Sequence, residues 1–313
     1  MFPVKTGGLK NVAVLLYALL KIWARLALWL YCGKITFRYA GGNAPCILAC
    51  THPNSFLDAI VMGAYMPRSL HFLARGDAFR KPRVASLLKG MHMIPIFRLS
   101  EGKENLQRNE ETFKLSLDVL RRNGCILIFP EGICINENKV RPLKKGTARL
   151  SFSAWDDPGL EHLVIQPVSI NYSSFTAVPK HIEVVFGEQI KKGDAGHVKE
   201  LNDLLHNRLV TGMHTPASRK GHSILLALPA LLGYITQRWF YVMWRNFARK
   251  KTRNTVFYDS VVFCLLMLTY PVFVLAATLL LVWLAGPYGW LALPLLPFTA
   301  WAWKEYRLFH TAE

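Results

Sequence analysis

A stretch of 44 consecutive residues without Asp, Glu, Lys or Arg, from Ser260 to Trp303, is the strongest constraint on how this chain folds. A helix that crosses a bilayer needs about 20 predominantly apolar residues, so the stretch is long enough for two crossings. The segment Gly286-Pro-Tyr-Gly289 interrupts it, and glycine and proline favour a turn at that point. The sequence therefore predicts a transmembrane helical hairpin.

Basic residues flank this stretch on both sides, and none lies at its internal break. The cluster before it consists of Arg245, Arg249, Lys250, Lys251 and Arg253. Lys304 and Arg307 follow its end. Because positively charged flanks stay on the cytoplasmic side of a membrane, both ends of the hairpin are expected there. We expect an integral membrane protein whose main domain lies on the cytoplasmic face, of the inner membrane if the cell is bacterial.

The formal net charge of +18 indicates a polyanionic partner. Nucleic acid and an anionic bilayer are the two candidates. The chain has no zinc-finger spacing, no helix-turn-helix pattern and no basic-aromatic RNA signature. The long apolar stretch favours the bilayer, so we expect an anionic membrane as partner and no nucleic acid.

The six cysteines are scattered through apolar runs, which is typical of buried free thiols in a reducing compartment. Cys46 and Cys50 are four residues apart in a predicted strand, a spacing that gives no zinc site. No group of further His or carboxylate ligands is evident. We therefore expect neither a metal nor a cofactor.

The N-terminal segment from Leu9 to Tyr31 is apolar but carries Lys21 and Arg25 on one helical face. It lacks the unbroken apolar centre and the small-residue cleavage site of a signal peptide. An amphipathic helix in the membrane interface is the expected structure, with a core helix of a soluble domain as the alternative.

A second apolar segment, from Ile224 to Trp244, contains Pro229 and Gly233 and reaches Arg238 too early for a straight membrane crossing. We expect helix breaks at the proline and the glycine. The segment is therefore predicted to be interfacial or re-entrant.

Between these two segments, strand-like and helix-like patterns alternate along the chain. Strands are predicted over residues 34–39, 45–50, 71–74, 91–97, 125–129, 163–170 and 181–186. Helices are predicted from residue 55 and over 84–89, 104–122, 147–155 and 195–213. This alternation predicts an α/β fold, a largely parallel sheet flanked by helices, with ligands at the carboxyl ends of the strands.

The stretch Thr51-His-Pro-Asn-Ser-Phe-Leu-Asp58 follows the apolar run over residues 45–50. His52 lies at the exit of a buried strand, and Asp58 lies in the first turns of a helix for which Asn54 and Ser55 are candidate N-caps. A carboxylate that holds an imidazole gives a general base with its orienting group, which can activate a hydroxyl or a water. A structural histidine is the alternative.

Two more chemically competent residues lie where a predicted strand ends. Arg98 follows the strand over 91–97, and Glu131 follows the strand over 125–129. The carboxyl ends of parallel strands meet at one edge of the sheet. Together with His52, these residues predict a site at that edge.

Four blocks resemble those of the glycerolipid acyltransferase family, which includes the PlsC-type 1-acylglycerol-3-phosphate acyltransferases and the glycerol-3-phosphate acyltransferases. The blocks are His52 to Asp58, Ile96 to Arg98, Phe129 to Gly132 with Leu143 to Arg149 behind it, and Ile165 to Val168. They follow the order and approximate spacing of the family over residues 45–172. The resemblance implies a glycerol-3-phosphate acyltransferase-like fold.

Two departures from the family pattern bear on the acceptor. Five residues separate His52 from Asp58, where four are commonest, and this spacing is similar to a subgroup that includes fungal glycerol-3-phosphate and dihydroxyacetone-phosphate acyltransferases. The third block usually continues with Thr-Arg-Ser, but here it continues with Ile133-Cys-Ile135. Phosphate binding is therefore expected to depend more on Arg98, Lys144 and Lys145.

The resemblance implies a role for each matching residue. His52 would take the proton of a glycerol hydroxyl that attacks an acyl thioester directly, and Asp58 would fix the imidazole tautomer. Arg98, Lys144 and Lys145 would bind the acceptor phosphate, Glu131 would hold an acceptor hydroxyl, and Gly132 would let the backbone approach. The sequence is consistent with transfer that has no acyl-enzyme intermediate, because the chain has no Gly-x-Ser-x-Gly nucleophile elbow.

The expected domains are a membrane-interface helix over residues 1–33, an acyltransferase catalytic domain over 34–215, an interfacial or re-entrant segment with its basic cluster over 216–258, and the transmembrane hairpin with a cytoplasmic tail over 259–313. The expected reaction transfers a fatty acyl group from acyl-CoA or acyl carrier protein to lysophosphatidate or glycerol-3-phosphate in phospholipid biosynthesis, with dihydroxyacetone phosphate as a further acceptor. The alternatives are a lipid hydrolase that uses the same His and Asp, and a non-catalytic membrane lipid-binding protein.

Overall fold

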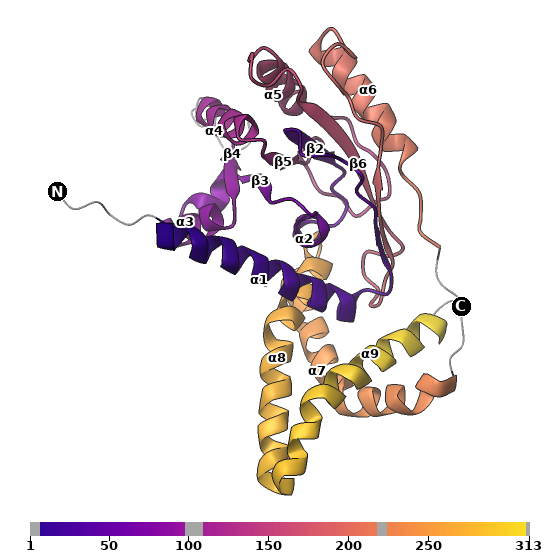
Figure 1. Cartoon of the computed structure of the whole chain (residues 1–313). Helices are drawn as coiled ribbons and strands as arrows, with labels where there is room; N and C mark the ends of the chain where they lie inside the picture. Colours follow the sequence, from indigo (N-terminus) through magenta and orange to yellow (C-terminus); the bar gives the residue numbers. More distant parts are fainter. Residues whose placement is uncertain (1–6, 98–108, 218–223, 311–313) are drawn as a thin grey trace, which may run out of the picture.

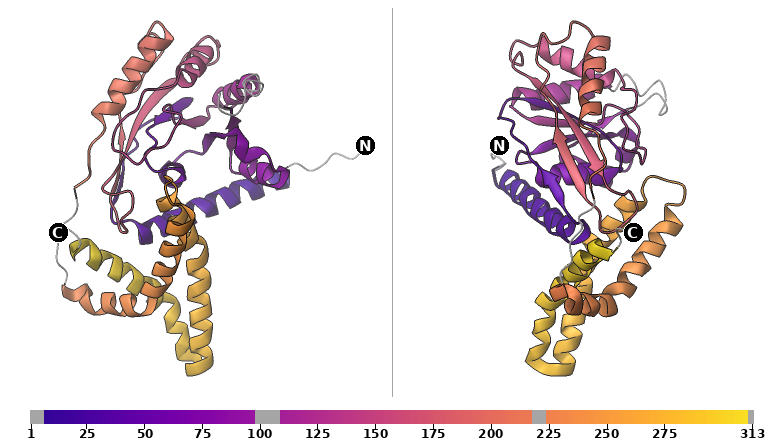
Figure 2. Two further views of the ribbon diagram at one scale, coloured as in Figure 1. Left: turned by 180° about the vertical axis from the view of Figure 1, so that it is seen from behind. Right: turned by 90° about the vertical axis from the view of Figure 1, so that its right-hand side faces the viewer.

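The structure is a computed structural model that describes residues 7–97, 109–217 and 224–310. It has two parts, an α/β domain and a set of C-terminal helices that extends away from it (Figure 1). The N-terminal helix lies between the two parts. A view from behind and a view from the side show the same arrangement (Figure 2).

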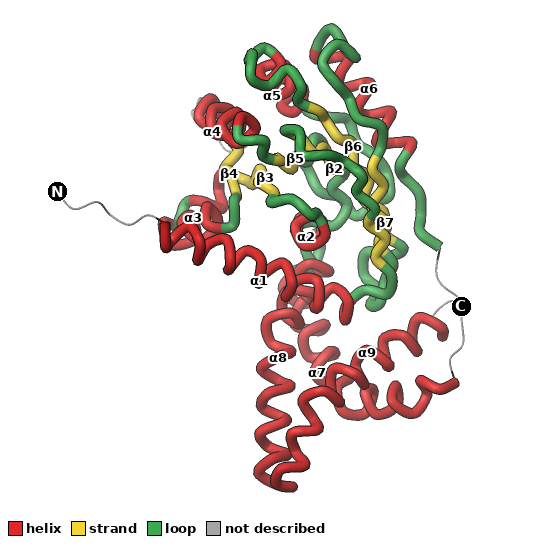
Figure 3. The backbone as a smooth tube through the Cα atoms, in the orientation of Figure 1, coloured by secondary structure: helices red, strands yellow, loops and turns green. Residues whose placement is uncertain are grey.

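Seven strands form one sheet in the order β1-β7-β6-β2-β5-β3-β4 (Figure 3). The strands are β1 (Ile35–Phe37), β2 (Cys46–Cys50), β3 (Leu70–Arg75), β4 (Met93–Ile96), β5 (Cys125–Ile128), β6 (Val164–Tyr172) and β7 (Ile182–Phe186). Every pairing is parallel except that of β6 with β7. All seven predicted strands are present, and the predicted α/β fold with a largely parallel sheet is confirmed.

Helices cover both faces of the sheet. Within the α/β part these are α1 (Gly7–Tyr31), α2 (Phe56–Tyr65), α3 (Pro82–Gly90), α4 (Asn109–Arg121), α5 (Gly146–Trp155) and α6 (Val198–Thr211), with a 3-10 turn η1 (Gly76–Phe79) after β3. Every residue of β2 and β5 is buried. Successive side chains point to opposite faces, so Ile47 and Leu48 belong to two different cores, one on each face of the sheet. Burial on both faces explains why these strands are continuous apolar runs rather than alternating ones.

The C-terminal part consists of α7 (Ala227–Lys251), α8 (Tyr258–Ala285), a 3-10 segment η5 (Gly286–Leu291) and α9 (Ala292–His310). The expected helical hairpin is present, with its turn at Gly286 to Leu291. The helical stretch Tyr258–Tyr306 is long and apolar enough to cross a membrane, with a mean hydropathy of 2.4 over its most apolar window. Crossing itself stays a prediction.

The helix breaks predicted at Pro229 and Gly233 are wrong, because α7 continues through both residues. Pro229 lies in the first turn, where its missing N–H group has no intrahelical partner to lose. Gly233 faces α9, and a Cβ atom at this position would collide with the backbone carbonyl oxygen of Thr299. The glycine therefore permits a close contact between two helices instead of ending one.

The two charged residues predicted on one face of α1 bind the end of α2. The Lys21 ammonium donates to the Met66 carbonyl at 2.5 Å, and the Arg25 guanidinium donates to the Ala64 carbonyl at 2.6 Å. Cations suit this place because the last carbonyls of a helix lack intrahelical partners and carry partial negative charge. Other side chains of α1, including Leu26 and Trp29, are exposed. The place of this exposed apolar face in a membrane interface stays a prediction.

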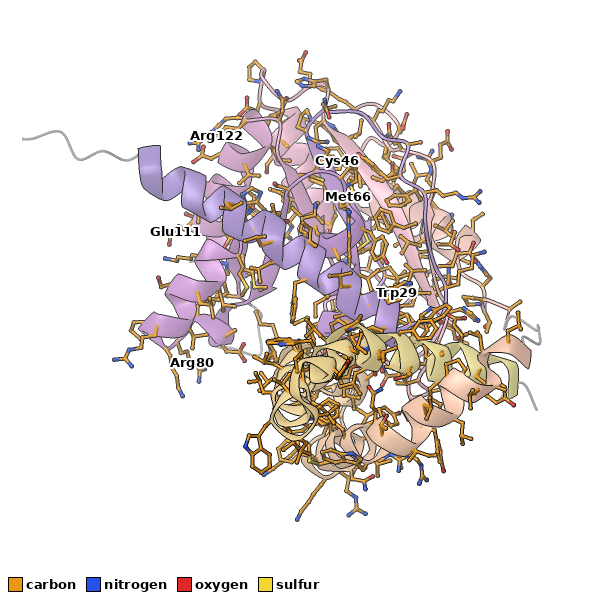
Figure 4. The ribbon with its side chains drawn as sticks, turned by 60° about the horizontal axis from the view of Figure 1, so that its bottom comes forward. Trp29, Cys46, Met66, Arg80, Glu111 and Arg122 are labelled. Atoms are coloured by element: carbon orange, nitrogen blue, oxygen red, sulfur yellow. The ribbon has the colours of Figure 1, made fainter. Side chains whose placement is uncertain are left out.

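The far end of α1 is joined to α9. Trp29 lies where α1 meets the C-terminal helices (Figure 4) and stacks on Trp301. The Lys304 ammonium donates to the carbonyl oxygens of Trp29 at 2.7 Å and Cys32 at 3.0 Å. Lys304 is only 5% exposed, so a residue that follows the uncharged stretch is a buried cap of α1.

We predict that Lys304→Met lowers the free energy of unfolding by about 1.5–3 kcal/mol, because methionine keeps the side-chain length but loses the charge-assisted hydrogen bonds to α1. Thermal or denaturant unfolding of the full chain in detergent measures the change. Lys250→Met removes the same charge from an exposed position at the end of α7 and is expected to change stability by less than about 0.5 kcal/mol. Equal effects of the two substitutions would contradict the capping role.

Candidate active site

His52 and Asp58 meet at the carboxyl end of β2. The Nδ1 atom of His52 lies 2.9 Å from the Oδ2 atom of Asp58, which is fully buried in the first turn of α2, whereas the imidazole is 17% exposed. The structure therefore brings together the two residues that the sequence analysis pairs. With Nδ1–H bonded to the carboxylate, the other ring nitrogen, Nε2, is left to accept a proton.

The plane of the imidazole is set by Phe129, which follows β5. The two rings stack with their centroids 3.8 Å apart and their planes 13° apart. Because β5 is the parallel neighbour of β2, the residues that leave both strands lie at the same edge of the sheet. A stacked ring on one face and a carboxylate on Nδ1 together restrict the imidazole to one orientation.

Asp58 receives hydrogen bonds from two donors besides His52. The Tyr172 hydroxyl donates to Oδ1 at 2.7 Å, and the Asn54 backbone N–H donates to Oδ2 at 2.8 Å. Burial raises the pKa of Asp58, and the hydrogen bonds from His52, Asn54 and Tyr172 oppose that rise. Burial, followed by the nearby Asp58 charge, raises the pKa of Tyr172 well above its ordinary value, so this residue stays a donor.

Glu131 holds two loops together. Its Oε1 atom accepts the His52 backbone N–H, and its Oε2 atom accepts the Arg141 backbone N–H, both at 3.1 Å. Burial raises the pKa of Glu131, and the two backbone hydrogen bonds oppose that rise. The visible contacts of this carboxylate thus position the backbone of His52, and its predicted contact with an acceptor hydroxyl stays a prediction.

Gly132 and the two lysines form the exposed rim beside Glu131. Gly132 has a φ of +67°, in the left-handed region that favours glycine. The stem of Lys144 lies against it, 3.2 Å from where a Cβ atom would be. Lys144 and Lys145 are exposed, and neither forms an ion pair with another described residue. Arg98, predicted to bind phosphate, lies outside the described residues.

Ser55, one of the two candidate N-caps of α2, is confirmed at that position, but the helix has no side-chain cap. Ser55 occupies the N-cap position with a φ of 53° but makes no capping hydrogen bond through its side chain. Its backbone N–H donates instead to the Cys134 sulfur, 2.9 Å away, and the Asn54 amide donates to Asp259. Burial raises the pKa of Cys134 to about 12, so this thiol is not an ionised nucleophile at neutral pH.

Several residues around the His52–Asp58 pair were not identified from sequence. They are Tyr172 at the end of β6 and four buried residues, Asp259 and Ser260, which bind Asn54, and Tyr31 and Lys180, which bind Asp259. Asp259 carries one available signal, since it is an acidic residue directly before the uncharged stretch. Tyr172 and Lys180 have no local signal, because their contacts depend on how distant segments meet. Within the described ranges, no group of three or more His, Cys, Asp and Glu side chains is arranged to hold a metal ion.

A family model and a curated protein are similar to part of this chain. Residues 34–171 match the family model described as Acyltransferase. A curated 1-acyl-sn-glycerol-3-phosphate acyltransferase from Bacillus subtilis (strain 168) is 27% identical over 106 residues, which cover 34% of this chain and 48% of the relative. The chain thus spans about half the length of the curated relative that it matches.

A solved structure is also similar to this chain. The crystal structure of the 1-acyl-sn-glycerophosphate (LPA) acyltransferase PlsC from Thermotoga maritima matches with a TM-score of 0.50 at 14% sequence identity. The match covers 65% of this chain and 80% of that one. At this identity the likeness shows the fold alone.

We predict that Tyr172→Phe lowers the free energy of unfolding by about 1–3 kcal/mol at neutral pH, because a buried carboxylate oxygen loses its donor. The substitution raises the pKa of Asp58 further, since it removes a bond that favours the ionised form. The cost is therefore full above the folded-state pKa of Asp58 and shrinks as the pH falls through it. Denaturant unfolding at neutral and acid pH measures both effects. Tyr39→Phe, at a half-buried hydroxyl 3.5 Å from the Gly42 carbonyl, is the matched control with little change expected.

Proposed function

We propose that residues 34–171, which match the family model described as Acyltransferase, form the core of a PlsC-like membrane enzyme that transfers a fatty acyl group from an acyl thioester to a hydroxyl of a phosphorylated glycerol. The observation that carries the proposal is the His52–Asp58 pair with its 2.9 Å hydrogen bond at the carboxyl edge of the sheet. The name of the Bacillus subtilis relative supports 1-acylglycerol-3-phosphate as acceptor, with glycerol-3-phosphate as the other acceptor proposed.

In the proposed mechanism, Nε2 of His52 removes the proton from the acceptor hydroxyl as its oxygen attacks the thioester carbonyl carbon. Asp58 stabilises the imidazolium that forms and keeps the ring in one tautomer. When the tetrahedral intermediate collapses, the carbon–sulfur bond breaks and the imidazolium protonates the leaving thiolate. The acyl group is then esterified to the acceptor, and His52 is neutral again.

Recognition of the acceptor is assigned to its phosphate. Arg98 would bind the dianion through two parallel hydrogen bonds, and Lys144 and Lys145 would supply point charges. The exposure of both lysines and the contact of Lys144 with Gly132 support this assignment. The acyl donor would be acyl-CoA or acyl carrier protein, and a chain of net charge +18 attracts either one.

The membrane is the proposed place of reaction. The apolar stretch Tyr258–Tyr306 supports anchoring, and the basic cluster before it supports a cytoplasmic orientation. A lysophosphatidate acceptor is itself a membrane lipid, so an anchored domain would meet its substrate at the bilayer surface. In a bacterial cell this would be the cytoplasmic face of the inner membrane.

We predict that His52→Ala lowers the rate of acyl transfer about 100- to 10,000-fold, the usual contribution of a general base, and leaves membrane association intact. The measurement is product formation by purified enzyme with 1-acylglycerol-3-phosphate, glycerol-3-phosphate and dihydroxyacetone phosphate, each with acyl-CoA and with acylated carrier protein. His162→Ala changes an exposed histidine and serves as the control.

The same assay separates the alternatives. Release of fatty acid without an acceptor would indicate a hydrolase. If the unmodified protein shows no turnover and His52→Ala binds lipid as well as the unmodified protein does, the chain is a lipid-binding protein. Near-normal transfer by His52→Ala would overturn the role of this histidine.

We predict that Lys144→Gln raises the KM for the phosphorylated acceptor roughly 10-fold and changes kcat less, because one charge-assisted contact to phosphate is lost in the ground and transition states alike. Steady-state kinetics with varied acceptor measure the split. Lys199→Gln removes an equal charge from the exposed face of α6 and should leave both constants unchanged. An equal rise in KM for both variants would show a general field effect rather than a phosphate contact.

A further inference from the structure

We propose that Asp259, in the first turn of α8, is a positioning residue for the His52–Asp58 pair, so that the C-terminal hairpin is part of the support of the active site. This inference rests on the proposed function, because it assigns a kinetic role to a residue that does not touch substrate. It concerns the segment from Pro53 to Leu57, which lies between the histidine and the aspartate.

A continuous chain of hydrogen bonds runs from α8 to the imidazole. The Oδ2 atom of Asp259 accepts from the Asn54 side-chain amide at 2.6 Å. The backbone N–H of the same Asn54 donates to Asp58 at 2.8 Å, and Asp58 holds His52 at 2.9 Å. A shift of Asn54 would therefore move a donor of the carboxylate that orients the base.

Ser260 holds the same segment at two further points. Its hydroxyl donates to the Asn54 carbonyl at 3.0 Å and accepts the Leu57 backbone N–H at 3.1 Å. Ser260 and Asn54 are fully buried. Two consecutive residues of α8 thus bind the segment between His52 and Asp58 through its side chain and its backbone.

The charge of Asp259 is balanced by residues from two other parts of the chain. Lys180, from the connection between β6 and β7, lies with its ammonium 2.5 Å from Oδ2, and the Tyr31 hydroxyl at the end of α1 donates to Oδ1 at 2.5 Å. Asp259 and Lys180 are each 1% exposed. Burying a carboxylate without such partners would cost free energy. Lys180 and Tyr31 offset that cost, so Asp259 can be buried as the acceptor of the Asn54 amide.

Stability alone does not account for this cluster. Replacing a buried ion pair by well-packed apolar residues often leaves stability unchanged or raises it. What an apolar contact cannot do is accept the Asn54 amide in a fixed direction. Asp259 is one hydrogen bond away from Asn54, which lies between the base and its orienting carboxylate. The direction of this bond matters because small displacements of catalytic groups lower the rate by large factors.

The test compares two variants of the full chain. In Tyr31→Phe/Lys180→Met/Asp259→Leu, the polar cluster becomes apolar and no buried charge is left unpaired, so the chain is expected to fold, with a lower unfolding midpoint because the Asn54 amide loses its acceptor. In Asn54→Ala, the side-chain link is removed and the charged cluster is kept. We expect both variants to lose about 10- to 100-fold in kcat with little change in acceptor KM.

The two losses should not multiply. Adding Asn54→Ala to the triple variant should lower kcat no further, because both changes cut the same link. The control is Thr278→Val, a near-isosteric change at a fully buried position further along α8, which should leave kcat unchanged. A folded triple variant with normal kcat, or an Asn54→Ala variant with normal kcat, would overturn the positioning role.

A second readout separates this inference from the proposed reaction. The Nδ1 proton of His52 should give a far-downfield proton NMR signal in the unmodified chain, identified by its loss in His52→Ala. We expect the signal to move or broaden in both variants and to stay in Thr278→Val. Absence of acyl transfer with these spectral changes would overturn the proposed reaction and keep the positioning role, whereas an unchanged signal in both variants would overturn the positioning role.

Discussion

The parallel pairing of β2 with β5 is the constraint on which the active-site geometry depends. The two strands are buried on both faces and are in register from Cys46 with Cys125 onward. Consequently the residues that follow them leave the sheet together. His52 and Phe129 stack, and Glu131 reaches back to the His52 backbone. A slip in this register by one residue would separate His52 from Phe129 and Glu131, since successive residues of a strand face opposite sides.

The second constraint is that charge at this edge is buried and needs donors. Asp58 has three donors and Glu131 has two backbone N–H groups. Two of these bonds join distant parts of the chain, Tyr172 to Asp58 and the His52 backbone to Glu131. The polar contacts that satisfy the carboxylates therefore also fix the loops in place, so the same interactions solvate the buried charge and position His52.

The sequence predicts the features that depend on local pattern. All seven strands, the helical hairpin and the adjacency of His52 and Asp58 follow from periodicity, spacing and the parallel-sheet rule. Pro229 ends no helix for a local reason, its place in the first turn of α7, whereas the other wrong predictions involve a tertiary contact. Gly233 ends no helix because α9 packs against its bare backbone. Ser55 occupies the N-cap position of α2, and the Asn54 side chain binds Asp259 through its amide instead of capping the helix. Neither partner is local in sequence, so a local pattern cannot reveal them.

The same reasoning changes the meaning of the uncharged stretch. Its two immediate flanking charges, Asp259 and Lys304, are buried within the protein, at 1% and 5% exposed, one against Asn54 and the other against the end of α1. An apolar helix face can be buried equally well in lipid or against protein. Apolar contacts alone therefore do little to fix the orientation of the hairpin relative to the α/β domain. Polar anchors at both ends of the hairpin supply it. Of the two charges that delimit the predicted membrane segment, Asp259 thus holds it to the segment between His52 and Asp58, and Lys304 holds it to the end of α1.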